Sequence, residues 1–168
     1  MPRPFDVSTD SPYSVEQIHR AFGDESYWQA RIAHFGGGTT TLDHLTVDSA
    51  GSVSVATSQG LRSDALPGPL AKVFRGGLSV VRTERWHADG DGAVSGEITI
   101  SASGVPGSGV GSAVLSPLPH GSRLSLAGTL EVRIPLVGGR IEKYIGDQIV
   151  VEIPELQRFT SDWVAQHG

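Results

Sequence analysis

The chain has 168 residues, of which 18 are acidic and 13 basic, so its formal net charge is -5, and it contains no cysteine. This length suits one domain, and the lack of cysteine excludes disulfides, thiolate metal sites and a cysteine nucleophile. No two Lys or Arg residues are adjacent and no long apolar run is present, so we expect no nucleic-acid partner, no membrane insertion and a cytoplasmic location.

The first part of the chain predicts one short strand followed by two short helices. Apolar residues alternate with polar ones from Phe5 to Thr9, which favours a strand. Ser14 is a typical N-cap, and apolar residues then recur at helical spacing up to Gly23. A second helix is expected from about Asp24 to the glycines at 36–38.

From Thr39 the apolar period changes to two, which predicts antiparallel strands. Residues 39–55 form a hairpin around the turn sequence DSAG, and the alternation places Asp43 on the face of Leu45 and Val47. Residues 61–77 break the alternation at a Pro-Gly-Pro sequence, so we expect a loop there, with a turn of helix at 70–74. This loop is long enough to cover another part of the molecule.

Three further segments complete the predicted sheet. Residues 78–101 form a second hairpin around an ADGDG turn, and residues 104–115, GVPGSGVGSAVL, form a turn that leads into a strand. Residues 124–134 alternate cleanly, with leucine, valine and isoleucine on one face and charged or hydroxyl side chains on the other. An antiparallel sheet with one apolar face must be covered on that face.

The C-terminal part predicts one long amphipathic helix, which is large enough to cover the sheet. Its apolar stripe follows helical spacing along roughly 28 residues, and it runs through Ile141, Ile145, Ile149, Glu152, Leu156, Phe159 and Trp163. Proline inside a helix removes one hydrogen bond and clashes with the preceding turn, so Pro154 predicts a kink near residues 150–153.

The glycine-rich segments do not indicate a nucleotide site. A dinucleotide-binding loop requires glycines at a junction between a strand and a helix, but Gly107, Gly109 and Gly111 follow one predicted strand and precede another. The pair Gly138-Gly139 does precede a helix, yet a tight turn at that place needs glycine in any case. We therefore expect turns at both places and no cofactor.

The order of elements resembles the START-like superfamily, also called Bet v 1-like or SRPBCC, in which a curved sheet wraps a long C-terminal helix around a cavity. Residues 11–37, SPYSVEQIHRAFGDESYWQARIAHFGG, look like the start of that superfamily. Glu84-Arg85-Trp86 before a DG turn, together with IPLVGGRIEKYI at 134–145, looks like an uncharacterised domain-of-unknown-function branch found in actinobacteria.

This resemblance covers the whole chain and implies one ligand-binding domain over residues 1–168. The implied fold is α+β of the helix-grip type: a strand, two short helices, a curved antiparallel sheet of about seven strands in total, and the long helix packed across its concave face. Members of the superfamily commonly bind lipids, sterols or aromatic compounds, and some are cyclases or hydrolases. The motifs are structural, so they bring no established catalytic residue with them.

Strand 78–86 carries the most informative polar residues. If Leu78 and Val80 face inward, a period of two places Arg82, Glu84 and Trp86 on the same inner face. Charged groups inside a protein are costly unless they are paired or hydrated, so this arrangement predicts a pocket with polar anchors. The alternative is a bulge after Val81 that leaves the Arg/Glu pair on the surface.

We predict that the protein binds a mostly apolar small molecule between the sheet and the long helix. The apolar walls would come from the two central strands and the helix, and Arg82, Glu84 and Tyr144 would be the polar anchors. The full set of predicted ligand-binding residues is Arg82, Glu84, Trp86, Ile98, Ile100, Leu126, Leu130, Val132, Tyr144, Ile145, Gln148 and Ile149.

Two other classes of function stay open at this stage. Carboxylates at Glu84 and Asp43 could serve as general acid and base in a cyclase or hydrolase, although salt bridges or contact with solvent are the more common explanation of such carboxylates. Glu152 could likewise face either a pocket or solvent. A protein-interaction module with a filled core is the third reading. The histidines show no metal-binding spacing and there is no G-x-S-x-G motif, so we expect no metal and no nucleophilic serine.

Overall fold

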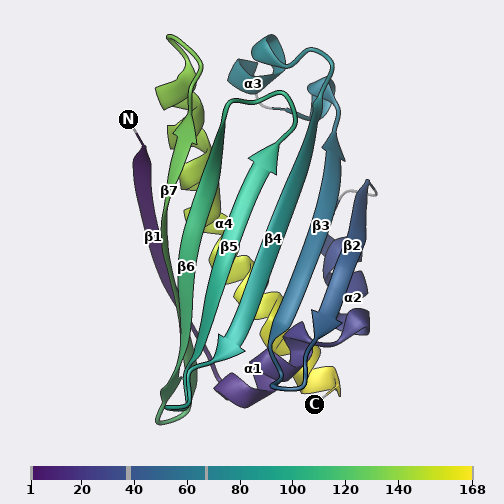
Figure 1. Ribbon diagram of the computed structural model, residues 1–168, viewed down its shortest axis with the longest axis vertical. Helices are drawn as coiled ribbons and strands as arrows, with labels where there is room; N and C mark the ends of the chain where they lie inside the picture. The colour runs from purple at the N-terminus through teal and green to yellow at the C-terminus, as the bar shows by residue number, and fades with distance from the viewer. Residues whose placement is uncertain (1, 37–38, 67, 168) are drawn as a thin grey trace.

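The computed structural model describes residues 2–36, 39–66 and 68–167, and it shows a curved antiparallel sheet that packs around one long helix (Figure 1). In chain order the elements are β1 (Arg3–Ser11), α1 (Val15–Phe22), α2 (Glu25–Phe35), β2 (Thr40–Val47), β3 (Val53–Leu61), the 3-10 turn η1 (Ser63–Ala65), α3 (Gly68–Val73), β4 (Leu78–Ala88), β5 (Val94–Ala102), β6 (Gly107–Leu118), β7 (Gly121–Val132) and α4 (Gly138–His167).

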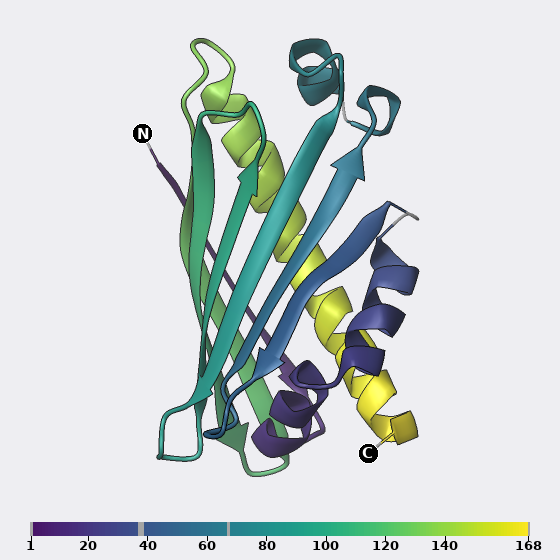
Figure 2. The same ribbon diagram turned by 45° about the vertical axis from the view of Figure 1, so that its right-hand side comes forward.

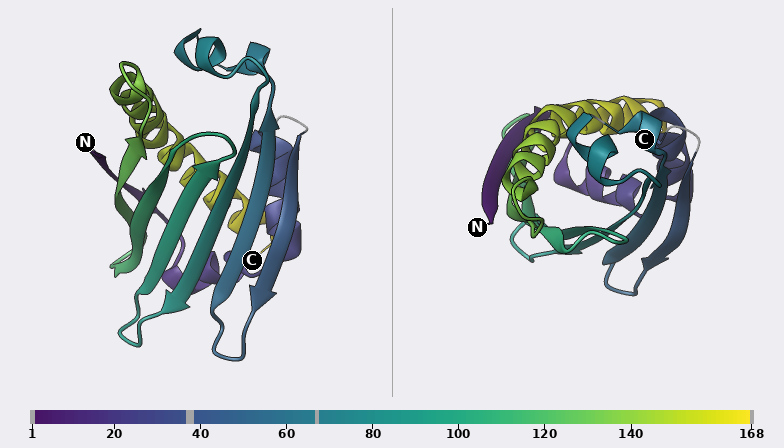
Figure 3. Two further views of the ribbon diagram at one scale, coloured as in Figure 1. Left: turned by 45° about the horizontal axis from the view of Figure 1, so that its top comes forward. Right: turned by 90° about the horizontal axis from the view of Figure 1, so that it is seen from above.

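The seven strands form one sheet in the order β1-β7-β6-β5-β4-β3-β2, and every neighbouring pair is antiparallel. The first strand therefore lies beside the last one, while the other strands follow one another as hairpins. Seen from above, the sheet curls so far that α4 closes its open side (Figure 3). This is the helix-grip α+β fold that the sequence predicts.

The short helices lie at opposite ends of the sheet. Helices α1 and α2 pack at the end where α4 finishes, and α3 lies at the other end, near the start of α4 (Figure 2). Helix α1 begins at Ser14, whose hydroxyl accepts a hydrogen bond from the Gln17 amide, while the Gln17 side chain accepts one from the Ser14 amide. This capping box confirms the predicted start of the helix.

Helix α4 is 30 residues long and continues without interruption through Pro154, so the kink near residues 150–153 stays a prediction. Its buried face departs from the predicted stripe in the middle of the helix. Glu152 is exposed, and Ile153 is the buried residue at this point. The C-terminal half of α4 then packs Leu156 and Val164 into the main core.

Two apolar clusters of unequal size hold the sheet and the helices together. The larger one lies at the end with α1 and α2 and contains a group of buried rings that includes Phe22, Tyr27, Trp28 and Trp86. The smaller one lies at the other end, where Ile141 and Leu66 are buried with partly buried neighbours. The space between the sheet and the first half of α4 is consequently less densely filled.

Candidate ligand-binding cavity

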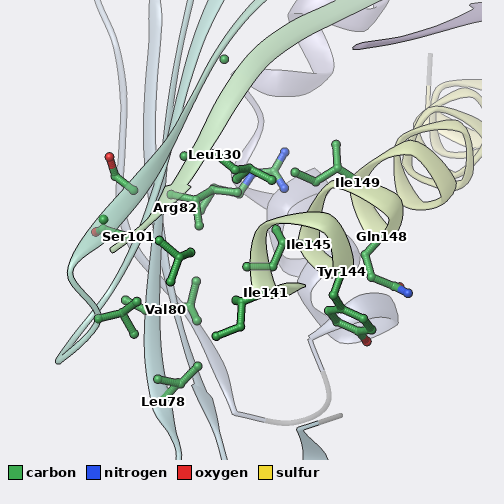
Figure 4. Close-up of a pocket in the computed structure, with 18 of the residues that line it drawn as sticks. Leu78, Val80, Arg82, Ser101, Leu130, Ile141, Tyr144, Ile145, Gln148 and Ile149 are labelled. Atoms are coloured by element: carbon green, nitrogen blue, oxygen red, sulfur yellow. The ribbon is translucent and has the colours of Figure 1, made fainter. Parts of the chain in front are cut away.

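A cavity of about 390 Å³ lies between the concave face of the sheet and the N-terminal half of α4 (Figure 4). Most of its wall is apolar, as expected for a small-molecule site. Side chains from β4, β5, β7 and α4 point into it from opposite sides, and the main ones are Leu78, Val80, Ile98, Ile100, Leu130, Ile141, Ile145 and Ile149.

The structure brings the predicted ligand-binding residues to this region. All of them except Glu84 and Trp86 line the 390 Å³ cavity. Glu84 and Trp86 line a second cavity of about 30 Å³, which shares Arg82, Ile98 and Leu126 with the first. The predicted residues therefore line two neighbouring cavities that share part of their walls, but whether they bind a ligand stays a prediction.

The glycines of β6 leave space in the cavity wall. Gly109 and Gly111 face inward and line the cavity. They lie within β6, which begins at Gly107, so the turn expected at these glycines is wrong and the strand starts earlier than predicted. A Cβ atom on Gly109 would lie 2.8 Å from Cδ2 of Leu130, which is the paired residue on β7. Glycine at this position therefore lets the Leu130 side chain lie back against the sheet instead of projecting further into the cavity.

The inward orientation of β4 is confirmed. The strand pairs with β3 and β5 without a register shift, so the alternative of a bulge after Val81 is wrong. Glu84 is 3% exposed, and its carboxylate accepts hydrogen bonds from Arg82 Nε at 3.0 Å and from Trp86 Nε1 at 3.1 Å. Arg31 of α2 forms a second ion pair with it, with 3.5 Å between Nη2 and Oε2.

These partners keep Glu84 ionised. Burial alone would raise the pKa of the Glu84 carboxyl group, but the positive charges of Arg82 and Arg31 and the hydrogen bonds from Trp86 and Arg82 outweigh that effect, so its pKa lies below the usual range. A carboxylate that is held in this way is poorly suited to take up or release a proton near neutral pH.

Arg31 is the residue of this cluster that sequence analysis missed. It lies on α2 with its guanidinium 4.6 Å from the centre of the Trp28 ring, and its Nη1 donates a hydrogen bond to the Tyr27 hydroxyl at 3.5 Å. Burial alone would lower its pKa, but Tyr27, Glu84 and Glu152 raise it, so Arg31 stays charged. No local signal connects Arg31 with Glu84, because 53 positions separate them in the sequence.

The inward orientation predicted for Asp43 is wrong. The pairing of β2 with β3 shifts register between Leu42 and His44, and this bulge turns Asp43 outward. Its carboxylate accepts hydrogen bonds from Thr41, at 2.9 Å, and from Ser58 on the exposed surface, and these bonds lower its pKa. Asp43 is consequently not positioned to act together with Glu84.

The end of the cavity opposite Glu84 is closed in part by the segment that was predicted to be a covering loop. Leu61, Leu66 and Phe74 from this segment line the cavity, and α3 extends the expected helical turn to Gly68–Val73. Tyr144, Gln148 and Glu152 on α4 also line the cavity although all three are exposed, so they form its solvent-facing side. Sequence spacing grouped these three residues correctly.

The described ranges contain neither a cluster of metal ligands nor a helix that could span a membrane. Among residues 2–36, 39–66 and 68–167 there is no group of three His, Asp or Glu side chains that could hold a metal ion. In the same part of the chain, none of the helices is both long and apolar enough to cross a bilayer.

The chain has a START-like, helix-grip fold with an interior cavity. The protein TTHA0849 of Thermus thermophilus is similar over 99% of both chains, with a TM-score of 0.59 and 15% identity. Norcoclaurine synthase from Thalictrum flavum is similar over all of this chain and 89% of its own, with a TM-score of 0.51 and 11% identity. Identities this low show a shared fold only.

The sequence comparison identifies the family. Residues 6–164 match the family described as "Protein of unknown function (DUF2505)". An uncharacterised protein of Mycobacterium tuberculosis is 42% identical over 173 aligned positions, which cover 99% of each chain. The chain belongs to the DUF2505 family, as its resemblance to an actinobacterial domain of unknown function predicted.

Proposed function

We propose that this protein binds a mostly apolar small molecule in the cavity between the sheet and α4. The observation that carries the proposal is the cavity itself: its volume of about 390 Å³ lies within the range of known ligand pockets, roughly 300–1,000 Å³, and few polar groups interrupt its wall. Cavities of this size are uncommon in protein interiors, because close packing normally fills them.

The fold comparison supports the same function without naming a ligand. Norcoclaurine synthase, which shares the fold, has been solved in complex with dopamine and hydroxybenzaldehyde, so a protein of this architecture can hold aromatic molecules. The two alternatives have less support. Glu84 is fixed by two arginines and Asp43 faces outward, so the proposed acid–base pair has no suitable geometry, and the cavity argues against an interaction module with a filled core.

A fluorescence titration with the neutral apolar probe N-phenyl-1-naphthylamine tests the proposal. We expect saturable binding with one site per chain, and we expect Ile145→Trp to abolish it, because the indole ring would fill the space that Ile145 borders. Val151→Trp is the matched control, since Val151 lies on the same helix, is 61% exposed and does not line the cavity. Failure of the wild-type protein to bind the probe, with no apolar compound extractable from it, would overturn the proposal.

A further inference from the structure

The inner end of the apolar cavity holds a guanidinium group that is only partly used by the protein. Arg82 lines the cavity, and its side chain is 22% exposed. Its Nε donates to Glu84, but in the part of the chain that the structure describes neither Nη atom makes a hydrogen bond to another residue. The close-up shows the guanidinium extending from β4 toward Ile149 on α4 (Figure 4). Four N–H groups are thus free for a ligand.

The charges around Arg82 do not balance locally. Two guanidinium groups, those of Arg31 and Arg82, share the single buried carboxylate of Glu84. The other carboxylates that line the cavity are those of Glu152, which is exposed and contributes to the raised pKa of Arg31, and Glu131, which pairs with Arg133 at 2.6 Å. Water screens exposed charges far more than buried ones, so the inner end keeps a positive charge that is not fully compensated.

A buried side-chain amide near Arg82 also lacks a hydrogen-bond acceptor. Gln157 on α4 is 3% exposed, and its Nε2 has no hydrogen-bond partner among the described residues. It lines the 30 Å³ cavity together with Arg31, Arg82 and Glu84. Buried polar groups are nearly always paired, so an unpaired N–H donor beside two arginines indicates that an acceptor belongs in this region.

We propose that the ligand is an amphipathic carboxylic acid, with its carboxylate on the Nη atoms of Arg82 and its apolar part along the cavity toward α3. This inference rests on the proposed function and names the chemical class of the ligand. The planar guanidinium group matches a carboxylate through two parallel hydrogen bonds, and such charge-assisted bonds are stronger away from bulk water. The apolar walls then contact a hydrocarbon chain or an aromatic ring.

Competition against bound N-phenyl-1-naphthylamine at pH 7 tests this proposal with matched pairs of acid and alcohol. Decanoate and decanol represent an aliphatic ligand, and 2-naphthoate and 2-naphthol an aromatic one. We expect the acid to bind roughly tenfold to a hundredfold more tightly than the alcohol in at least one pair, which corresponds to hydrogen bonds with a charged group. The pair with the larger difference shows whether the apolar part of the ligand is aliphatic or aromatic.

The variants Arg82→Gln and Arg85→Gln locate the effect. Arg82→Gln is expected to remove the preference for the acid while the neutral probe still binds. Arg85 lies on the same strand but is exposed on its opposite face, so Arg85→Gln should keep the preference. If Arg82→Gln does not fold, the acid–alcohol comparison in the wild-type protein still decides the question.

The outcomes separate the two proposals. If the neutral probe binds but neither acid exceeds its alcohol, the carboxylate site is refuted and the apolar binding site stands. If Arg82→Gln and Arg85→Gln lower the preference equally, Arg82 does not hold the carboxylate and the site is refuted as well. If the probe does not bind the wild-type protein and no apolar compound can be extracted from it, the proposed function itself fails.

Discussion

At the scale of single residues, Glu84 connects the core with the cavity. Its carboxylate accepts hydrogen bonds from a core tryptophan and a cavity arginine, and it forms an ion pair with a helix arginine. Removing one partner of a buried ion pair leaves the other charge uncompensated, which typically costs about 3–5 kcal/mol. We expect Glu84→Gln to lower the free energy of unfolding by about this amount in urea denaturation.

Glu97→Gln is the control for that prediction. Glu97 is exposed on β5, and surface substitutions usually change stability by less than about 0.5 kcal/mol. Equal losses in both variants would show that the buried cluster contributes no more than a surface carboxylate. A large loss of stability in Glu84→Gln would also show that a structural role accounts for the buried glutamate, with no need to assign it a role in catalysis.

The lowered pKa of His19 predicts how the stability of the protein depends on pH. Burial lowers the His19 pKa below the usual 6.5, and the His19 Nε2 atom has no hydrogen-bond partner among the described residues. The unfolded chain therefore binds a proton at higher pH than the folded one, so stability is complete above about pH 6.5 and falls as the pH decreases below it. Urea midpoints between pH 8 and 5 should show this slope in the wild-type protein and less of it in His19→Gln.

The control for this prediction is His120→Gln in the exposed turn before β7. This variant should keep the wild-type slope, because removing an exposed side chain leaves the partly buried imidazole of His19 in place. An unchanged slope in His19→Gln would contradict the assignment. Glu84 adds a separate decrease in stability at lower pH, because its pKa is also lowered in the folded state and its stabilising charge is lost only as the pH falls through that value.

At the scale of elements, the apolar period was enough to predict the helices, the hairpins and the inward face of β4. It failed at Asp43, because a bulge adds one residue to a strand and leaves no trace in the alternation. On α4 the predicted stripe included Glu152, whereas the structure buries Ile153 at this point and leaves Glu152 exposed at the rim of the cavity, where both of the surroundings left open for it meet.

Some residues of the site could be predicted from sequence spacing, whereas others depend on contacts between distant segments. Residues on one strand or one helix, such as Arg82 with Glu84 or Tyr144 with Gln148, follow from spacing alone. Arg31 reaches Glu84 only because α2 packs against the sheet, and the unpaired Gln157 becomes visible only once its surroundings are known. Pairing between distant segments depends on tertiary packing, which a single sequence does not show.

A substitution in β6 tests whether glycine shapes the cavity wall. In Gly109→Ala the new methyl group meets Leu130 Cδ2, the end of a flexible side chain, so we expect Leu130 to move into the cavity. Probe affinity should fall roughly fourfold, the equivalent of one lost methylene contact. Gly60→Ala on β3 is the control, since nothing lies within 4 Å of its Cβ position. Equal probe affinities in the two variants would contradict this role of Gly109.

At the scale of the whole molecule, one end of the protein is densely packed and the other end contains the cavity. The large aromatic core joins α1, α2 and the C-terminal half of α4 to the sheet, whereas the N-terminal half of α4 faces the cavity and the smaller cluster around Ile141 and Leu66. Regions with fewer buried apolar contacts open at lower free energy than the global core. One helix therefore spans two environments of different local stability.

Hydrogen exchange along α4 provides the corresponding measurement. Without ligand, we expect the amides of residues 141–149 to exchange faster than those of 153–164, because the first segment borders the cavity and the second the main core. A ligand present at about a hundred times its Kd should slow amide exchange in the first segment by up to roughly a hundredfold. Exchange in the second segment should slow much less, because a bound ligand opposes only those opening motions that disrupt its binding site. Ile145→Trp should remove the ligand's effect. Equal protection of both segments would mean that α4 opens as one unit with the whole fold, and that the end with the cavity does not open by itself.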